Sequence, residues 1–212
     1  MSGPKPRPPQ QRLIVYVDGF NLYHGVRDQA GRATLWLDLV KLAQSFRPSQ
    51  RLVALVYFTA PVLNDPPGQG RQALYQNALS QLYPSQVEII QGHYQSESVQ
   101  CVRCGHTDTK YGEKETDVNI ATTILMDAAL HNMDTAILVS ADSDLAPAVG
   151  AAIKLHPPLF ITAAFPPNRR SNELKALMPS SFPIGRSKIV QSQLPATFTA
   201  GGTSFKRPGH WN

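Results

Sequence analysis

Short apolar runs rich in β-branched residues recur along the chain, and segments with apolar residues at helical spacing separate most of them. The runs cover residues 12–17, 51–60, 87–94, 135–139 and 159–165. Short runs that are apolar at every position are typical of strands buried on both faces of a parallel sheet. Helices between such strands imply right-handed βαβ crossovers. The sequence therefore predicts an α/β fold, a three-layer sandwich with a mostly parallel central sheet.

The ends of the chain and one internal segment lack this alternation. Residues 1–11 are basic and rich in proline, and residues 191–212 are rich in Ser, Thr, Gly and Pro. We expect both to be disordered. Residues 12–190 should form one domain, with a sixth strand at 187–190. Residues 95–115 are polar and show neither strand nor helix periodicity, so they are expected to form an inserted loop.

The size and charge of the chain limit its class. Its 212 residues, 42% of them apolar, suffice for one α/β domain with a sizeable core. The formal charge of +5 is compatible with a polyanionic partner, although many basic proteins bind no nucleic acid. No apolar run approaches the roughly 20 residues that span a bilayer, and no export signal precedes the domain. We expect a cytoplasmic protein with no membrane partner, and a homo-oligomer is compatible with the sequence.

Acidic residues follow two of the predicted strands and begin a helix. Asp18 directly follows the first strand, and Asp142 and Asp144 follow the fourth. Asp117 opens the helix that leads into that fourth strand. Ligands of open parallel sheets bind beyond the carboxyl ends of the strands, near the point where the strand order reverses. We therefore expect these carboxylates to meet at one edge of the sheet.

A cluster of carboxylates needs a cation to remain ionised. Two carboxylates about 4 Å apart repel by roughly 4 kcal/mol at an effective dielectric of 20. Mg²⁺ and Mn²⁺ prefer carboxylate oxygen and water as ligands. A metal held in this way can polarise a phosphate and activate a bound water. The acids thus predict a Mg²⁺ or Mn²⁺ site suited to hydrolysis of phosphodiester bonds.

Three segments carry a resemblance to a known family. VDGFNLYHG at 17–25, EKETDVNIATTILMDA at 113–128 and ILVSADSDLAPAV at 137–149 resemble the signature blocks of NYN domains. These domains are a branch of the PIN-like nucleases that includes bacterial LabA-like proteins. The resemblance covers roughly residues 12–165 in the family's order and spacing. It implies a PIN-like fold and a metal-dependent endoribonuclease, with RNA, in particular single-stranded RNA, as the substrate.

The resemblance also implies roles for individual residues. Its acidic metal-binding positions match Asp18, Asp117 and Asp142, with Asp144 as a further acidic position beside them. Asn21 matches an asparagine that supports the first aspartate or touches substrate, and Ser140 occupies a small hydroxyl position before the Ala-Asp pair. Ala141 stands where many relatives have glycine. No required acid is missing, so the sequence gives no sign of lost activity.

Other readings of these residues stay open. Asp142 and Asp144 are also suited to capping a helix, and for Asp144 capping and metal ligation are equally supported. Tyr23 is placed to stack on an unpaired base. Lys114 is a candidate contact for phosphates, although a solvated loop lysine is the simpler interpretation. A PIN-like scaffold that binds RNA or protein without turnover is the rival function.

The two cysteines of the chain, Cys101 and Cys104, form a single Cys-x-x-Cys pair in the polar segment. His93 and His106 are near enough in sequence to complete a four-ligand zinc site, which would stabilise the segment. No second Cys-x-x-Cys is present, and two reduced thiols are the alternative. A structural Zn²⁺ therefore stands as a hypothesis beside the Mg²⁺ or Mn²⁺ site.

Overall fold

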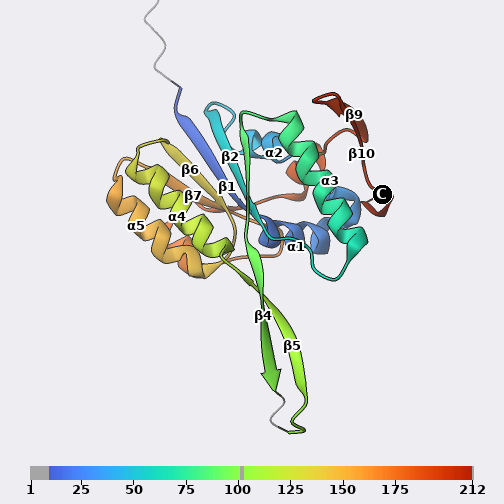
Figure 1. Ribbon diagram of the computed structural model, residues 1–212. Coiled ribbons are helices and arrows are strands. Elements are labelled where there is room, and N and C mark those ends of the chain that lie inside the picture. Colours follow the sequence, from blue (N-terminus) through green and yellow to red (C-terminus); the bar gives the residue numbers. More distant parts are fainter. Residues whose placement is uncertain (1–9, 101–102, 212) are drawn as a thin grey trace, which may run out of the picture.

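The structure is a computed structural model that describes residues 10–100 and 103–211 (Figure 1). Predictions made for residues 1–9 and for Cys101 lie outside the described residues. Gln11, assigned to a disordered arm, already belongs to the fold, because its carbonyl oxygen accepts a hydrogen bond from the Arg51 backbone at 2.9 Å. The described residues contain no helix that is both long enough and apolar enough to cross a membrane.

A six-stranded sheet in the order β3-β2-β1-β6-β7-β8 forms the middle layer. Its neighbouring strands all pair in parallel. The strands are β1 (Arg12–Asp18), β2 (Arg51–Thr59), β3 (Val87–Gln91), β6 (Thr135–Val139), β7 (Phe160–Phe165) and β8 (Phe182–Pro183). The predicted α/β sandwich with a parallel central sheet is confirmed.

The strand order reverses beside β1. The chain moves outward from β1 to β2 and β3, then returns to place β6 on the other side of β1 and moves outward again through β7 and β8. A crevice beyond the carboxyl ends of the strands at such a reversal is the usual ligand site of an open parallel sheet. The fold therefore directs attention to the ends of β1 and β6.

Strand β1 shows why the apolar runs are continuous. Leu13, Val15 and Val17 pack into the core on one face of the sheet. Ile14 and Tyr16 pack into the core on the other face. Side chains alternate between faces along a strand, so a sheet covered on both sides needs an apolar residue at every position.

Helices cover both faces of the sheet, and Figure 1 shows α4 and α5 on the side opposite α1, α2 and α3. One layer contains α1 (Gly19–Ala30), α2 (Leu39–Phe46), α3 (Pro66–Leu82) and α7 (Arg186–Gln191). The other contains α4 (Thr116–Ala129), α5 (Ala146–Leu155) and α6 (Asn172–Leu177). Single turns of 3₁₀-helix occur at η1 (Arg32–Thr34), η2 (Ser143–Leu145) and η3 (Gly209–Trp211).

The polar segment expected to be a loop is a β-hairpin. Strand β4 (His93–Gln100) pairs antiparallel with β5 (Thr107–Lys114), from His93 opposite Lys114 to Gln100 opposite Thr107. Figure 1 shows the hairpin projecting beyond the body of the domain. A hairpin that projects into solvent has no buried face, so it leaves no apolar alternation in the sequence.

The tail predicted to be disordered is folded, which corrects the domain boundary at residue 190. Strands β9 (Thr197–Ala200) and β10 (Thr203–Lys206) pair around Gly201 and Gly202, whose φ angles are 55° and 77°. Phe205 and Trp211 are buried, at 1% and 5% exposure. Single aromatic residues, rather than aliphatic periodicity, attach this segment to the core. The strand expected at 187–190 is also wrong, because these residues lie in α7.

Candidate active site at the carboxyl edge of the sheet

Asp18 and Ser140 lie side by side where the strand order reverses. Asp18 is the last residue of β1, and Ser140 follows the end of β6. The two strands pair with Val17 opposite Val139, so the next residue on each strand reaches the same edge. The Ser140 hydroxyl donates a hydrogen bond to Asp18 Oδ2 at 2.8 Å. The structure thus brings together two residues that are 122 positions apart in the sequence.

Asp18 also begins helix α1. Its backbone is extended (φ −72°, ψ 105°), and its Oδ1 accepts a hydrogen bond from the Asn21 backbone N–H at 3.0 Å. An aspartate is favoured at this capping position because it satisfies an otherwise unpaired N–H of the first turn. The Asn21 side-chain oxygen in turn accepts from the Ala141 N–H at 3.4 Å. Asn21 therefore links α1 to the segment that follows β6.

Asp142 joins the same network through Ser140. The Asp142 backbone N–H donates to Ser140 Oγ at 3.0 Å, so this hydroxyl bonds to both acidic residues. Asp142 Oδ1 accepts from the Asp144 N–H at 3.0 Å and caps η2. Asp142 is half-buried and Asp144 is exposed. Asp142 therefore has the predicted capping role, whereas among the described residues the Asp144 carboxylate accepts no helix-capping hydrogen bond.

Burial dominates the electrostatics of Asp18, which is only 4% exposed. Loss of solvent raises the pKa of Asp18 above its ordinary value, and the nearby Asp142 carboxylate raises it further. Hydrogen bonds from the Asn21 backbone, Ser140 and the Asn21 side chain lower this pKa in part. Among the described residues, no basic side chain contributes to the shift of Asp18. Within residues 10–100 and 103–211, the site therefore holds a buried carboxylate without a cationic partner.

Asp117 lies in the first turn of α4 and is exposed. Helix α4 leads back to the beginning of β6, so its first turn lies towards the carboxyl edge, as predicted. Thr116 is the buried first residue of this helix, and Glu115 precedes it with φ 77°. The described part of the chain holds no group of three or more His, Cys, Asp or Glu side chains arranged to hold a metal ion. Asp18 and Asp142 are joined, whereas Asp117 does not complete a three-acid cluster with them.

The remaining predicted residues occupy the periphery. Tyr23 is on α1 with 40% of its surface exposed, and its ring is edge-on to His24 at 5.4 Å. Lys114 ends β5 and is exposed. Both positions flank the acidic edge along the chain, Tyr23 after Asp18 and Lys114 before Asp117.

The hairpin separates the residues suggested for zinc. His93 stands at its base and forms a 2.9 Å contact with Glu115 Oε2, while Cys104 is an exposed free thiol in the connecting turn. Seven residues separate His93 from Gln100, which is about 24 Å of strand at about 3.4 Å per residue. His93 therefore cannot join Cys104 in one metal site while the hairpin is formed. A zinc site with other ligands remains a hypothesis, since Cys101 lies outside the described residues.

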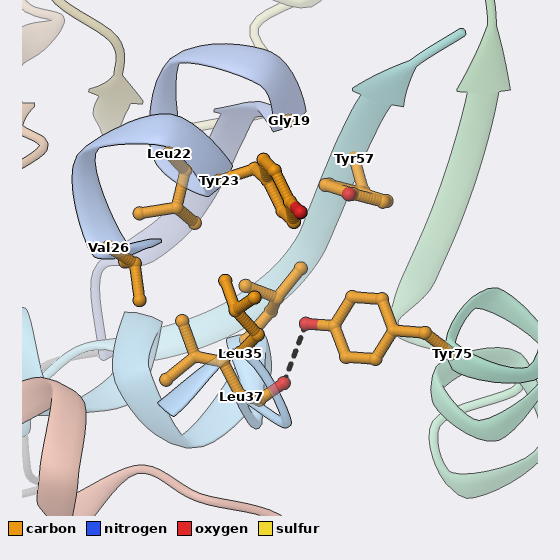
Figure 2. Close-up of a pocket in the computed structure, with 9 residues that line it drawn as sticks. Gly19, Leu22, Tyr23, Val26, Leu35, Leu37, Tyr57 and Tyr75 are labelled. Carbon is orange, nitrogen blue, oxygen red and sulfur yellow. Dashed lines mark hydrogen bonds between the residues drawn. The ribbon is translucent and has the colours of Figure 1, made fainter. Parts of the chain in front are cut away.

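A pocket of about 270 Å³ opens beside Gly19, the residue after Asp18. We call it the aromatic pocket, because its walls include Phe20, Tyr23, His24, Tyr57, Tyr75 and Trp211. A smaller hollow of about 30 Å³ shares Gly19, Tyr23 and Tyr57 with it. Figure 2 shows this hollow, with Tyr75 extending from α3 and its hydroxyl bonded to the Leu37 carbonyl oxygen.

Sequence reasoning missed the aromatic pocket, because its walls come from α1, β2, α3 and η3. Tyr57 is also a residue of the core, and Trp211 lies in the segment expected to be disordered. A Gly-Gly pair flanked by strand-like residues, TFTA-GG-TSFK at 197–206, is a hairpin signal that could have identified the segment carrying Trp211. No local pattern could have placed these rings together.

Comparisons with known proteins identify the family and the fold. The model of the NYN domain family matches residues 12–180. The 6-hydroxy-3-succinoylpyridine 3-monooxygenase HspA of Pseudomonas putida is 28% identical over 94% of this chain and 75% of its own length. A crystal structure of a Vibrio parahaemolyticus protein of unknown function is similar in fold, with a TM-score of 0.57 and 18% identity over 86% of this chain and 98% of that one.

Proposed function

The chain belongs to the NYN domain family, a nuclease-type family, and on that premise we propose that it is a metal-dependent endoribonuclease acting at the carboxyl edge of its sheet. One observation carries the proposal. The buried Asp18 carboxylate is joined to Asp142 through Ser140, and no basic residue among those described offsets its charge. A buried acid in this situation favours either a proton or an external cation.

The residues at this edge fit a hard divalent cation. Their donor atoms are carboxylate and hydroxyl oxygens, the ligands that Mg²⁺ and Mn²⁺ prefer. Asp18 and Asp142 would hold the ion, and Asp117 and Asp144 would contribute from exposed positions. When bound, Mg²⁺ or Mn²⁺ supplies a Lewis acid for a phosphate oxygen and lowers the pKa of a coordinated water.

The protein's own groups would orient this site. Ser140 holds Asp18 in one rotamer by donating to Oδ2, and its oxygen is held in turn by the Asp142 N–H. The Asn21 backbone fixes the other oxygen of Asp18. Fixing both carboxylate oxygens before substrate arrives reduces the reorganisation that accompanies reaction.

We propose single-stranded RNA as the substrate. Unpaired bases can stack on exposed aromatic rings, and Tyr23 offers one beside the acidic edge. Lys114, at the end of the hairpin strand that leads into α4, is placed to contact phosphates of the same strand. The chain's excess of basic residues suits a polyanion.

A second candidate function is chemistry on a small heteroaromatic molecule. The Pseudomonas putida relative is named as a monooxygenase of 6-hydroxy-3-succinoylpyridine. The aromatic pocket beside Asp18 is the observation in this chain that favours a ring-shaped substrate. The two candidates share the pocket and differ in whether the acidic edge acts on a phosphodiester.

The test is an assay of purified protein with end-labelled single-stranded RNA, double-stranded RNA and single-stranded DNA. We expect internal cleavage of single-stranded RNA with Mn²⁺ or Mg²⁺ and none with a chelator. Asp142→Asn should abolish this cleavage, whereas Asp28→Asn, an exposed acid paired with Arg27 on α1, should leave it unchanged. Full activity of Asp142→Asn would refute the assignment, and tight RNA binding without cleavage by the wild type would favour a binding module.

A further inference from the structure

The aromatic pocket has a floor of buried rings and an exposed ring at its rim. Tyr75 is held by its hydroxyl bond to the Leu37 carbonyl at 2.6 Å, and its ring meets Trp211 at 5.9 Å and 82°. Tyr57 meets Tyr75 edge-on at 6.3 Å. In contrast, Tyr23 is 40% exposed at the rim. Fixed rings lose little conformational entropy on binding, so this floor is preorganised for a flat ligand.

The size of the pocket limits its occupant. Its volume of about 270 Å³ is just below the range of about 300 to 1,000 Å³ that is usual for drug-sized ligands. One ring system therefore suits it better than a larger molecule. The rings that line it favour stacked or edge-to-face contacts with another aromatic ring.

Polar groups at the rim suit a heteroaromatic ring rather than a purely hydrocarbon one. Arg71 lines the pocket and forms a 3.4 Å contact with Asp65, which leaves most of its five N–H donors for other partners. Gln72, by comparison, is engaged by the Val62 N–H, the Ala60 carbonyl and Thr59. Asp65 is engaged as well, because its Oδ1 caps α3 by accepting from the Gly68 N–H at 3.0 Å and its Oδ2 contacts Arg71. Arg71 is thus the hydrogen-bond donor at the rim for ring nitrogen and oxygen atoms.

The pocket and the acidic edge share a wall. A Cβ atom added to Gly19 would lie 2.6 Å from the Phe58 carbonyl oxygen and 3.0 Å from the Tyr57 hydroxyl, so α1 begins directly against β2. Tyr57 lines the pocket, and Gly19 follows Asp18 in the chain. A ring bound here would therefore place atoms attached to it next to Asp18.

From this geometry we infer that the aromatic pocket binds one planar heteroaromatic ring and positions the group attached to it at the acidic edge. The inference deepens the proposed function, on which its link to cleavage rests. Two sources can supply such a ring: an unpaired base of an RNA chain, or a free heterocycle of the hydroxypyridine kind. The chemistry of recognition is shared, and the experiment distinguishes the sources.

Ring binding is measured by calorimetry on the full chain in EDTA, where no metal-dependent turnover occurs. The probes are adenosine 5′-monophosphate, 2-hydroxypyridine and, as a control without a ring base, ribose 5-phosphate. We expect at least one ring probe to bind and ribose 5-phosphate not to bind. Tyr23→Ala should weaken ring binding by about 5- to 100-fold, the loss typical of removing a stacking aromatic residue, and Tyr23→Phe should restore it.

Phe160→Ala is the matched control, because Phe160 is 41% exposed at the opposite end of the sheet. Failure of both ring probes to bind, or an unchanged affinity in Tyr23→Ala, would overturn the inference. Displacement of a bound probe by single-stranded RNA would identify the ring as a nucleobase, and failure of RNA to displace 2-hydroxypyridine would assign the pocket to a small molecule.

A chain that binds rings and cleaves nothing would refute only the nuclease assignment. A chain that cleaves RNA and binds no ring would refute only the pocket.

Discussion

Two aspartates at opposite ends of the same strand pair have opposite surroundings. Asp134 precedes β6 at the amino end and accepts hydrogen bonds from the Arg12 backbone at 2.8 Å and the Arg12 guanidinium at 2.9 Å. These bonds lower the pKa of Asp134. Asp18 ends β1 at the carboxyl end, where burial raises its pKa. Asp134 is paired with the Arg12 guanidinium, whereas Asp18 has no cationic partner in the part of the chain that the structure describes.

The contrast indicates that Asp134 has a structural role, joining two strands, whereas Asp18 is suited to a catalytic or metal-binding role. The Arg12–Asp134 pair ties the beginning of β1 to the beginning of β6 and leaves Asp134 no need for an external ligand. Asp18 is held by neutral donors and retains an unbalanced charge. Perturbed acids of this kind are concentrated at functional sites, although buried structural networks perturb pKa values as well. The following predictions test whether the two aspartates differ in function as they differ in surroundings.

The largest expected effect is on catalysis. Asp18→Asn should lower Mn²⁺-dependent cleavage of single-stranded RNA by about 10³-fold or more, because it removes a charged group that acts on the reacting centre. Asp134→Asn should retain activity within about twofold. Initial rates with labelled RNA, and circular dichroism as a check on folding, measure both. Equal losses of cleavage activity in the two variants would show that Asp18 and Asp134 do not differ in function.

Metal binding should stabilise the protein through Asp18. At a Mn²⁺ concentration about 100 times its Kd, the folded state gains about 2.7 kcal/mol, which corresponds to a rise in Tm of roughly 5 to 10 °C for a chain of this size. The rise should be present in the wild type and in Asp134→Asn and absent in Asp18→Asn. Thermal scans with Mn²⁺ and with EDTA measure it, and a rise that persists in Asp18→Asn would place the metal elsewhere.

Ser140 should act as a positioning residue. Ser140→Ala removes the donor to Asp18 and the acceptor for the Asp142 N–H, so we expect a loss of about 10- to 100-fold in activity or metal affinity, as for other residues that orient ligands. The Mn²⁺ concentration for half-maximal activity should rise, which a purely structural role would not cause. Ser192→Ala, at the buried serine that directly follows α7, is the control. No change in the Mn²⁺ dependence would contradict the role.

The smallest effect concerns the dependence of stability on pH. A raised pKa means that the folded state favours protonated Asp18, so its contribution is present at low pH and lost as pH rises through the folded-state pKa. A lowered pKa means that Asp134 contributes above its unfolded pKa and loses this contribution as pH falls. Relative to the wild type, Asp18→Asn should therefore gain in free energy of unfolding as pH rises above the ordinary aspartate pKa. Asp134→Asn should have a lower free energy of unfolding than the wild type above that pKa, and the difference should shrink as pH falls below it. Urea unfolding in EDTA measures both slopes, and slopes of the same sign would refute the contrast.

The parallel sheet and its acidic edge could be predicted because each rests on local patterns. Apolar runs identified β1, β2, β6 and β7, and the rule for parallel sheets predicted that Asp18 and Asp142 lie at one edge. Ser140, which joins them, was singled out only by the family resemblance. The capping aspartate and the Asn21 contact agree with the sequence motif. Strands that are buried on both faces of a sheet appear in the sequence as short, continuous apolar runs, which are easy to recognise.

The aromatic pocket, the hairpin and the C-terminal strands could not be predicted in the same way. The hairpin has no apolar face, and the tail is attached by isolated rings such as Phe205 and Trp211. Helix α1 follows Asp18 without a break, and its glycines and polar residues resemble a turn. The position of Asp117 depends on how α4 packs against the sheet. Spacing along the sequence therefore could not establish whether Asp117 lies beside Asp18 and Asp142.

The separation of Asp18 from Ser140 has a consequence for timing. Domains generally fold as units during synthesis, at about 5 to 20 residues per second. The 122 positions from Asp18 to Ser140 then correspond to roughly 6 to 24 s of translation. During that interval the growing chain carries Asp18 without the Ser140 hydroxyl that donates to it. Strand order thus delays assembly of the candidate site until β6 and the residue after it have been made.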